Sequence, residues 1–248
     1  MSAAVRLHDV TLGYERHPAV HHLDGVFEAG RLTAVVGPNG SGKSTLLRGV
    51  AGALEPLSGR IELQGLKPRD IAYLPQDPGV DRNFPMTLGE LVALGFWNKR
   101  GLFGGLRRAD RERLHDAFAA VGLHGFEDRP LNAVSGGQLQ RALFARVLLQ
   151  DARLILLDEP FSAVDQKTTA DLVELIQRWP REGRAVIVVL HDLELARDAF
   201  TDALLLAREK VAWGPARETL RPENLLKARR LSEAFDAHAH VCRRTEDA

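Results

Sequence analysis

The feature that most constrains this chain is a glycine-rich octapeptide, Gly-Pro-Asn-Gly-Ser-Gly-Lys-Ser, at residues 37–44. It fits the pattern G-x-x-x-x-G-K-S/T, whose glycines let backbone N–H groups close around phosphate oxygens. An apolar run at residues 32–36 precedes it and a helical pattern at residues 44–53 follows it, so the helix N-terminus would also face the phosphates. This context favours a phosphate site over a glycine-rich turn that binds nothing.

Within this loop, Lys43 would place a cation on the β- and γ-phosphates and Ser44 would offer its hydroxyl to Mg²⁺. The residues predicted to bind the nucleotide here are Gly37, Pro38, Asn39, Gly40, Ser41, Gly42, Lys43, Ser44 and Thr45. A phosphate loop alone does not separate a kinase from a GTPase or a motor, so the rest of the chain must decide the function.

Two further runs, residues 154–157 and 185–190, are wholly apolar, which is typical of parallel strands buried on both faces. Asp158 and Glu159 follow the first run, at the edge of the sheet where ligands bind in open α/β folds. Asp158 would hold the Mg²⁺ sphere and Glu159 would polarise an attacking water. The alternative is a helix N-cap with a solvated neighbour, which is less attractive beside a phosphate loop.

A second candidate anion site is Ser-Gly-Gly-Gln at residues 135–138, ahead of a helix predicted from about Leu139 to Gln150. Two glycines at a helix N-terminus expose N–H donors. The site lies about a hundred residues along the chain from Lys43. Because one chain seldom needs two γ-phosphate sites, we expect a second copy to arrive head-to-tail and pair this sequence with the phosphate loop.

The order of patterns predicts α/β segments on both sides of a helical insert. Apolar and polar residues alternate at 5–14, which predicts antiparallel strands. Short strands are expected at 61–63 and 71–74, and a closing hairpin is expected at 204–206 and 211–213. Helices are expected at 88–95, 110–121 and 168–179. We therefore assign residues 1–220 to one domain, with an α/β core and β subdomain at 1–86 and 151–220, a helical subdomain at 87–150, and a C-terminal helix and tail at 221–248.

The charges are balanced, with 33 Lys and Arg against 33 Asp and Glu, which argues against a nucleic-acid partner. A content of 45% hydrophobic residues fits a globular chain and excludes disordered and fibrous classes. The one cysteine cannot form an internal disulfide, and no apolar run reaches the ~20 residues of a membrane helix. We expect a cytoplasmic protein that borrows the membrane spans of a partner.

Taken together, these motifs resemble the ATP-binding subunits of ABC transporters over nearly the whole chain. Beyond the phosphate loop and Ser-Gly-Gly-Gln, the resemblance rests on Tyr14, on Gln76 in Tyr-Leu-Pro-Gln, on Leu-Leu-Asp-Glu-Pro at 156–160, on Asp165 and on His191. Val134 departs from the family, which usually has Leu there, but it keeps an apolar anchor. The resemblance implies a P-loop NTPase (RecA-like) core with an antiparallel β subdomain and an inserted α-helical subdomain.

The resemblance also implies roles for these residues. Tyr14 would stack on adenine, and Gln76 would touch Mg²⁺ and the attacking water while coupling to the membrane subunit. Asp165 would organise the dimer interface, and His191 would contact the γ-phosphate. Ser135, Gly136, Gly137 and Gln138 would serve the γ-phosphate of the opposite subunit. The simpler alternatives are a strand aromatic for Tyr14, a loop residue for Gln76 and a core or capping histidine for His191.

The implied assembly is a homodimer of ATPase subunits that use ATP and Mg²⁺ on the inner face of the membrane. The dimer would bind a permease, and an extracytoplasmic solute-binding protein would deliver the solute to that permease. Residues 80–87 resemble the Val-Asp-x-x-Phe-Pro-x-Thr stretch of zinc and manganese importers. We expect zinc first, or manganese. The alternatives are ferric siderophore, haem or cobalamin importers, then a soluble ABC ATPase of DNA repair or translation, and least of all a kinase.

Two groups of histidines remain outside these motifs. His238, His240 and Cys242 alternate near the C-terminus and could supply a partial zinc site, although ordinary tail residues are the simpler interpretation. His21 and His22 are adjacent, so their side chains should diverge, and we expect both on the surface.

Overall fold

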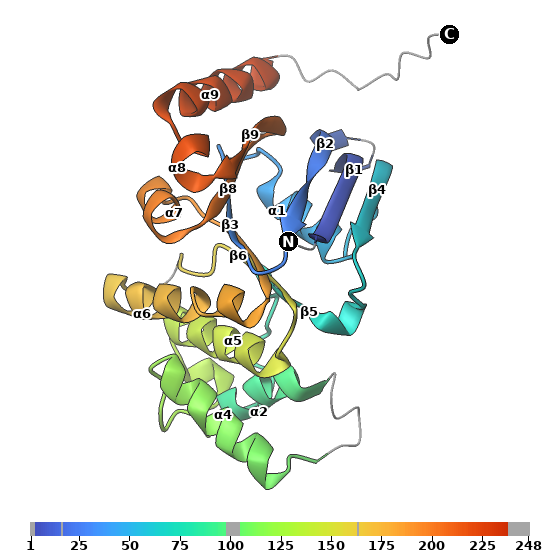
Figure 1. The fold of residues 1–248 in the computed structure, drawn as a ribbon. Helices are drawn as coiled ribbons and strands as arrows, with labels where there is room; N and C mark the ends of the chain where they lie inside the picture. Colours follow the sequence, from blue (N-terminus) through green and yellow to red (C-terminus); the bar gives the residue numbers. More distant parts are fainter. Residues whose placement is uncertain (1–2, 16, 98–104, 163, 238–248) are drawn as a thin grey trace.

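The computed structural model describes residues 3–15, 17–97, 105–162 and 164–237 (Figure 1). Within these ranges the strands form a three-stranded sheet in the order β2-β1-β4 and a six-stranded sheet in the order β5-β6-β7-β3-β8-β9. This arrangement, with helices on the sheets, confirms the predicted α/β class.

The small sheet is antiparallel and consists of β1 (Ala3–Tyr14), β2 (His17–Glu28) and β4 (Ser58–Leu63). In β2, exposed residues separate the buried Val20, Leu23 and Phe27, as in a strand with one covered face. The predicted surface position of His21 is wrong, because this side chain is only 8% exposed. His22 follows with a left-handed backbone (φ +45°), and its side chain is more than half exposed.

Four neighbouring strands of the large sheet pair in parallel: β5 (Ile71–Leu74), which is one edge of the sheet, then β6 (Leu154–Asp158), β7 (Ala185–Val189) and β3 (Leu32–Val36). Every residue of β3, β6 and β7 is buried. In β6, Ile155 and Leu157 join one core, whereas Leu154 and Leu156 join the core on the other face. The period of two therefore explains why these strands are apolar throughout.

The other edge of this sheet is the predicted hairpin, formed by β8 (Asp202–Ala207) and β9 (Glu209–Pro215). Helix α1 (Lys43–Val50) follows the phosphate loop; it ends before the predicted residue 53, ahead of Gly52 at φ +73°. The helices α6 (Gln166–Ile176) and α7 (Leu193–Ala199) follow β6 and β7. The helices α8 (Ala216–Thr219) and α9 (Pro222–Ala237) pack against β8.

The helical insert gathers at one end of the molecule, away from the small sheet (Figure 1). It contains α2 (Leu88–Ala93), α4 (Arg108–Ala120) and α5 (Gly136–Gln150), and both α2 and α4 pack against α5. Helix α5 begins at Gly136, three residues before the predicted start, because Ser135 caps it. Among the described residues, no helix combines the length and the apolar character that crossing a bilayer requires.

Candidate functional site

The phosphate loop turns between β3 and α1, and at two of its glycines the backbone passes too close to neighbouring segments for a side chain. A Cβ on Gly37 would overlap the carbonyl oxygen of Leu206, and one on Gly42 would meet the carbonyl of Ala19. Gly42 also has φ +92°, in the left-handed region where glycine carries no steric penalty. The sequence therefore places glycine where the loop has to pack tightly against β8 and β2.

Two polar groups inside this loop fit a phosphate ligand. Lys43 is only 6% exposed, and its Nζ donates hydrogen bonds to the carbonyls of Gly37 at 2.9 Å and Pro38 at 2.8 Å. Burial lowers the pKa of Lys43, while the charges of Glu159 and Asp158 raise it. The Oγ of Ser41 is buried with no hydrogen-bond partner among the described residues. A phosphate oxygen would satisfy both a buried ammonium and an orphaned hydroxyl.

Beside the loop, a hydroxyl and a carboxylate converge. Ser44 Oγ donates to Asp158 Oδ1 at 3.0 Å, and Asp158 ends β6 with 2% exposure. Burial raises the pKa of Asp158, and the charge of Glu159 raises it further, although the hydrogen bond from Ser44 opposes both. Because Mg²⁺ prefers oxygen ligands such as these, a divalent cation would compensate the buried charge.

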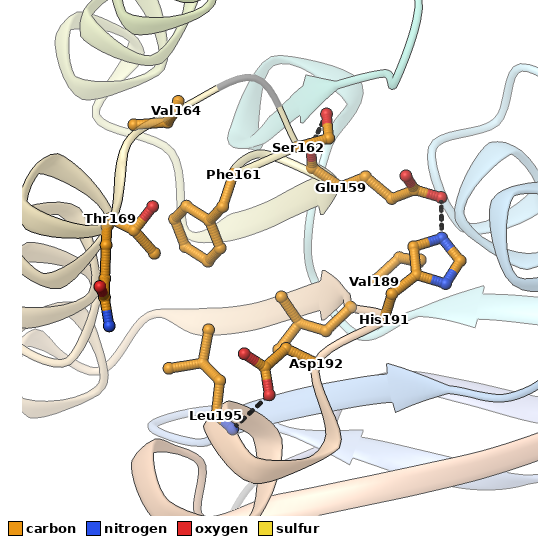
Figure 2. Close-up of a pocket in the computed structure, with 11 residues that line it drawn as sticks. Glu159, Phe161, Ser162, Val164, Thr169, Val189, His191, Asp192 and Leu195 are labelled. Carbon is orange, nitrogen blue, oxygen red and sulfur yellow. Dashed lines mark hydrogen bonds and ion pairs between the residues drawn. The ribbon is translucent and has the colours of Figure 1, made fainter.

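Three polar residues meet where three neighbouring parallel strands end. Gln76 follows β5, Glu159 follows β6 and His191 follows β7. Glu159 Oε1 lies 2.6 Å from His191 Nε2, a pair that Figure 2 shows, and Glu159 Oε2 accepts a 2.9 Å hydrogen bond from Gln76 Nε2. The sequence predicted each of these residues separately, and the structure brings them together.

These groups share one cavity of about 480 Å³ in front of the phosphate loop. It is lined by Ala19, Asn39, Gly40, Ser41, Gly42, Lys43, Ser44, Thr45, Gln76, Glu159 and His191. A neighbouring cavity of about 350 Å³ also reaches Glu159 and His191 and is lined by apolar residues such as Phe161 and Leu195 (Figure 2). Three further predicted residues do not line this cavity but contact residues that do. Gly37 and Pro38, at the start of the loop, accept from Lys43, and Asp158 accepts from Ser44.

Tyr14 ends β1 and is 45% exposed, with its ring at the tip of the first hairpin opposite His17. Its hydroxyl accepts a 3.0 Å hydrogen bond from Arg48 of α1. Arg48 was not among the residues predicted from sequence. No local pattern indicated it, because its partner Tyr14 lies 34 positions away along the chain.

The remaining predicted residues lie outside this cavity. Ser135 and Gln138 form a reciprocal cap on α5: Gln138 N donates to Ser135 Oγ at 3.2 Å, and Ser135 N donates to Gln138 Oε1 at 2.8 Å. Gly136 and Gly137 form the first turn. Asp165 caps α6 by accepting from the N–H and hydroxyl of Thr168, and these bonds lower its pKa.

Helix α5 is nevertheless linked to the segment that follows β6. The buried amide of Gln140, two residues after the cap, donates to the carbonyl of Pro160 at 3.4 Å. His238, His240 and Cys242 lie outside the described residues, so the predicted zinc ligands stay a prediction. The described ranges contain no cluster of three or more His, Cys, Asp or Glu that could hold a metal ion.

Comparison with known proteins decides the family. The family model described as "ABC transporter" matches residues 20–162, which span the phosphate loop, Ser-Gly-Gly-Gln and the Asp158–Glu159 pair. This chain belongs to the ABC transporter family. As an ABC ATPase subunit it binds and hydrolyses ATP, and the predicted P-loop NTPase fold is confirmed.

Curated ABC relatives match along most of the chain. The manganese transport system ATP-binding protein MntB of Bacillus subtilis (strain 168) is 37% identical over 90% of this chain and 91% of its own length. The zinc transport system ATP-binding protein TroB of Treponema pallidum is 35% identical over 91% of this chain and 86% of its own length. The predicted resemblance to the zinc/manganese type of ABC subunit is thus confirmed.

Solved ABC structures show the same fold. A metal-chelate type ABC transporter in an inward-facing conformation matches with a TM-score of 0.79 and 26% identity, over 92% of this chain and 90% of that one. A dimeric ATP-binding cassette bound to ADP and phosphate matches with a TM-score of 0.76 and 27% identity, over 86% of this chain and 99% of that one.

Proposed function

We propose that this chain powers the uptake of a divalent transition metal, zinc or manganese, by hydrolysing ATP on behalf of a partner permease. The observation that carries the proposal is the 35–37% identity, over about 90% of the chain, to ATP-binding proteins of manganese and zinc transport systems. The Val-Asp-x-x-Phe-Pro-x-Thr stretch at residues 80–87 supports the same class.

The surface around this stretch suits a membrane partner. Phe84 is 56% exposed, Trp97 is 50% exposed and Leu94 is 38% exposed, although most large apolar side chains of the chain are buried. Exposed apolar side chains that gather in one region of sequence are typical of interaction sites. We therefore place the permease contact on residues 84–97, which contain α2 at the start of the helical insert. This contact would seat the subunit peripherally on the inner face of the membrane.

We assign the chemistry to the groups at the three strand ends. Lys43 and the loop amides would hold the β- and γ-phosphates, and Ser44, Gln76 and Asp158 would hold Mg²⁺, which supplies charge neutralisation to the phosphates. Glu159 would accept a proton from the attacking water, since its carboxylate faces the cavity between Gln76 and His191. His191 would fix the orientation of that carboxylate and contact the γ-phosphate.

We further propose that two copies close head-to-tail around two ATP molecules. The cap at Ser135–Gln138 is not among the residues that line the chain's own phosphate cavity, so it is available to a second copy. The likeness to a dimeric cassette with ADP and phosphate supports this arrangement. Asp165 would lie at the dimer interface, and an extracytoplasmic solute-binding protein would deliver the metal to the permease.

A second candidate is the uptake of a metal chelate such as a ferric siderophore, haem or cobalamin. The likeness to a metal-chelate type transporter favours it, but the identity is only 26%, below that of the metal transport subunits. Both candidates use the same ATPase site, so only the transported substrate separates them.

Uptake by a strain that lacks this subunit separates the candidates. We expect the wild-type gene to restore accumulation of radioactive zinc or manganese, while Glu159→Gln does not. Growth on ferric siderophore, haem or cobalamin should be unchanged by the deletion. Restored chelate uptake with unchanged zinc and manganese uptake would overturn the proposal in favour of the second candidate.

A further inference from the structure

Tyr14 has little to fix its position apart from one hydrogen bond. It ends β1 next to Glu15, which adopts a left-handed backbone (φ +47°), and nearly half of its surface is exposed. An exposed aromatic side chain at a hairpin tip samples several rotamers unless a neighbour holds it. The neighbour here is Arg48, whose Nη1 donates to the Tyr14 hydroxyl at 3.0 Å.

Arg48 belongs to the helix that carries the phosphate loop. It stands three residues after Thr45, which lines the cavity, and five residues after Lys43. At about 1.5 Å of rise per residue, Arg48 lies roughly 7.5 Å along α1 from Lys43. The phosphate anchor and the residue that holds the aromatic ring therefore belong to one helix.

A second aromatic supports the position of the guanidinium. The hydroxyl of Tyr73, on β5, is buried without a geometric hydrogen-bond partner among the described residues, and it acts on Arg48 electrostatically. Together the two tyrosine hydroxyls raise the pKa of Arg48, Tyr14 more strongly than Tyr73. Arg48 as a whole is exposed, and its hydrogen bond to the Tyr14 hydroxyl is the contact that places the guanidinium beside this ring.

We propose that Arg48 is a positioning residue that holds the Tyr14 ring where the adenine base of ATP stacks. The inference rests on the role proposed for Tyr14. Its benefit is preorganisation: a ring that is already held loses less freedom when the base binds. Arg48 touches neither the phosphates nor the reacting atoms, so it should affect the affinity for adenine nucleotides and leave the chemical step unchanged.

Two variants remove the hydrogen bond from either side. Arg48→Met removes the donor and keeps an aliphatic chain, and Tyr14→Phe removes the acceptor and keeps the ring. We expect each to raise the Kd for MgADP, measured by calorimetry on the full chain, by about three- to tenfold. The double variant should be no weaker than either single one, because both remove the same bond. The KM for ATP should rise by the same factor at unchanged kcat.

Inorganic tripolyphosphate is the probe that isolates the base. Its Kd should stay within twofold of wild type in both variants, because it has no adenine. Arg178→Met is the matched control: Arg178 is an exposed arginine that pairs with Glu174 and does not line the phosphate cavity, so all constants should stay at wild-type values. Thermal unfolding of each variant confirms that it is folded before binding is compared.

Three results would overturn the proposal. Equal weakening of tripolyphosphate would place Arg48 in the phosphate site, and additive losses in the double variant would show two independent effects. Tyr14→Ala distinguishes a failure of the Arg48 inference from a failure of the stacking role of Tyr14. If it weakens MgADP while Arg48→Met and Tyr14→Phe do not, only the inference about Arg48 fails. If Tyr14→Ala has no effect on MgADP, the proposed stacking role of Tyr14 fails as well.

Discussion

Glu159 Oε1 lies 2.6 Å from His191 Nε2, and the two residues follow neighbouring parallel strands, β6 and β7. A carboxylate can only accept a hydrogen bond, so Nε2 carries the proton in this pair. In a neutral imidazole the other ring nitrogen, Nδ1, would then be the acceptor. The strand register therefore fixes both the orientation of the carboxylate and the tautomer of the imidazole.

The first prediction concerns this carboxylate. Glu159→Gln keeps the shape of the side chain but cannot accept a proton, so ATP turnover should fall by about 10²- to 10⁴-fold. The affinity for ATP should persist, because Lys43 and the loop amides are untouched, and the variant should stay in the closed dimer. Steady-state phosphate release and size-exclusion chromatography with ATP measure the two effects. Near-normal turnover would rule out Glu159 as the base.

The second prediction follows from the buried charge of Asp158. Burial raises the pKa of this carboxyl above its ordinary value of 3.8, so the folded state holds the proton more tightly than the unfolded chain does. The ionised group therefore costs stability as the pH rises from about 3.8 through the folded pKa, and the full cost applies above that pH.

Asp158→Asn removes that cost and can still accept from Ser44. The nucleotide-free variant should unfold about 2–4 °C higher at neutral pH for each kcal/mol gained, and the gain should shrink in acid. ATPase activity should be lost. Differential scanning calorimetry at several pH values measures the shift, with the exposed Asp171→Asn on α6 as control. A lower unfolding temperature at neutral pH would contradict the burial argument.

The third prediction compares two glycines of the same loop. Gly40 has φ +74° but open space around it, so Gly40→Ala should cost only the left-handed penalty, about 1–2 kcal/mol. Gly37→Ala should cost more, because its Cβ would overlap the Leu206 carbonyl, and it should also weaken ADP binding by displacing the loop. Urea unfolding and ADP titration test the order; equal costs would show that the contact with Leu206 relaxes freely.

The fourth prediction concerns the buried His21. Burial lowers its pKa below 6.5; the neighbouring His22 and Arg208 act in the same direction, whereas Glu209 and the Pro18 backbone oppose it. The folded state therefore binds the proton less readily than the unfolded chain. Stability should fall as the pH drops below about 6.5, until the folded pKa is reached.

His21→Gln should reduce this acid sensitivity between pH 7.5 and 5.5. His22→Gln is the matched control, because His22 is the adjacent histidine, is exposed and contacts Asp9 at 2.7 Å. Unfolding temperatures across this range measure the slopes. An unchanged slope in His21→Gln would assign the acid sensitivity to other groups.

Much of the site could be predicted because the chemistry is local in sequence. The phosphate loop and the apolar runs of β6 and β7 depend on short patterns, and their residues appear where those patterns place them. The start of α5 was missed because glycines in a first turn have weak helix propensity, and the cap of Ser135 and Gln138 outweighs it.

Contacts between distant segments could not be predicted. The bond from Arg48 to Tyr14 joins residues 34 positions apart, and nothing local to either one announces it. The burial of His21 likewise depends on packing against the turn at Arg208, to which its backbone N–H donates at 2.8 Å. Periodicity describes which face a side chain takes, whereas these contacts depend on how the two sheets meet.

Glu159 also has a left-handed backbone, with φ +50°, which typically costs a residue with a Cβ about 1–2 kcal/mol. The buried charge of Asp158 and the left-handed backbone of Glu159 therefore both lower the stability of the folded state. A chain with asparagine at position 158 and glycine at position 159 should therefore be more stable than this one and keep its fold. It should also lose ATPase activity, because both carboxylates are gone. An inactive, heat-resistant paralogue is therefore a short mutational distance away.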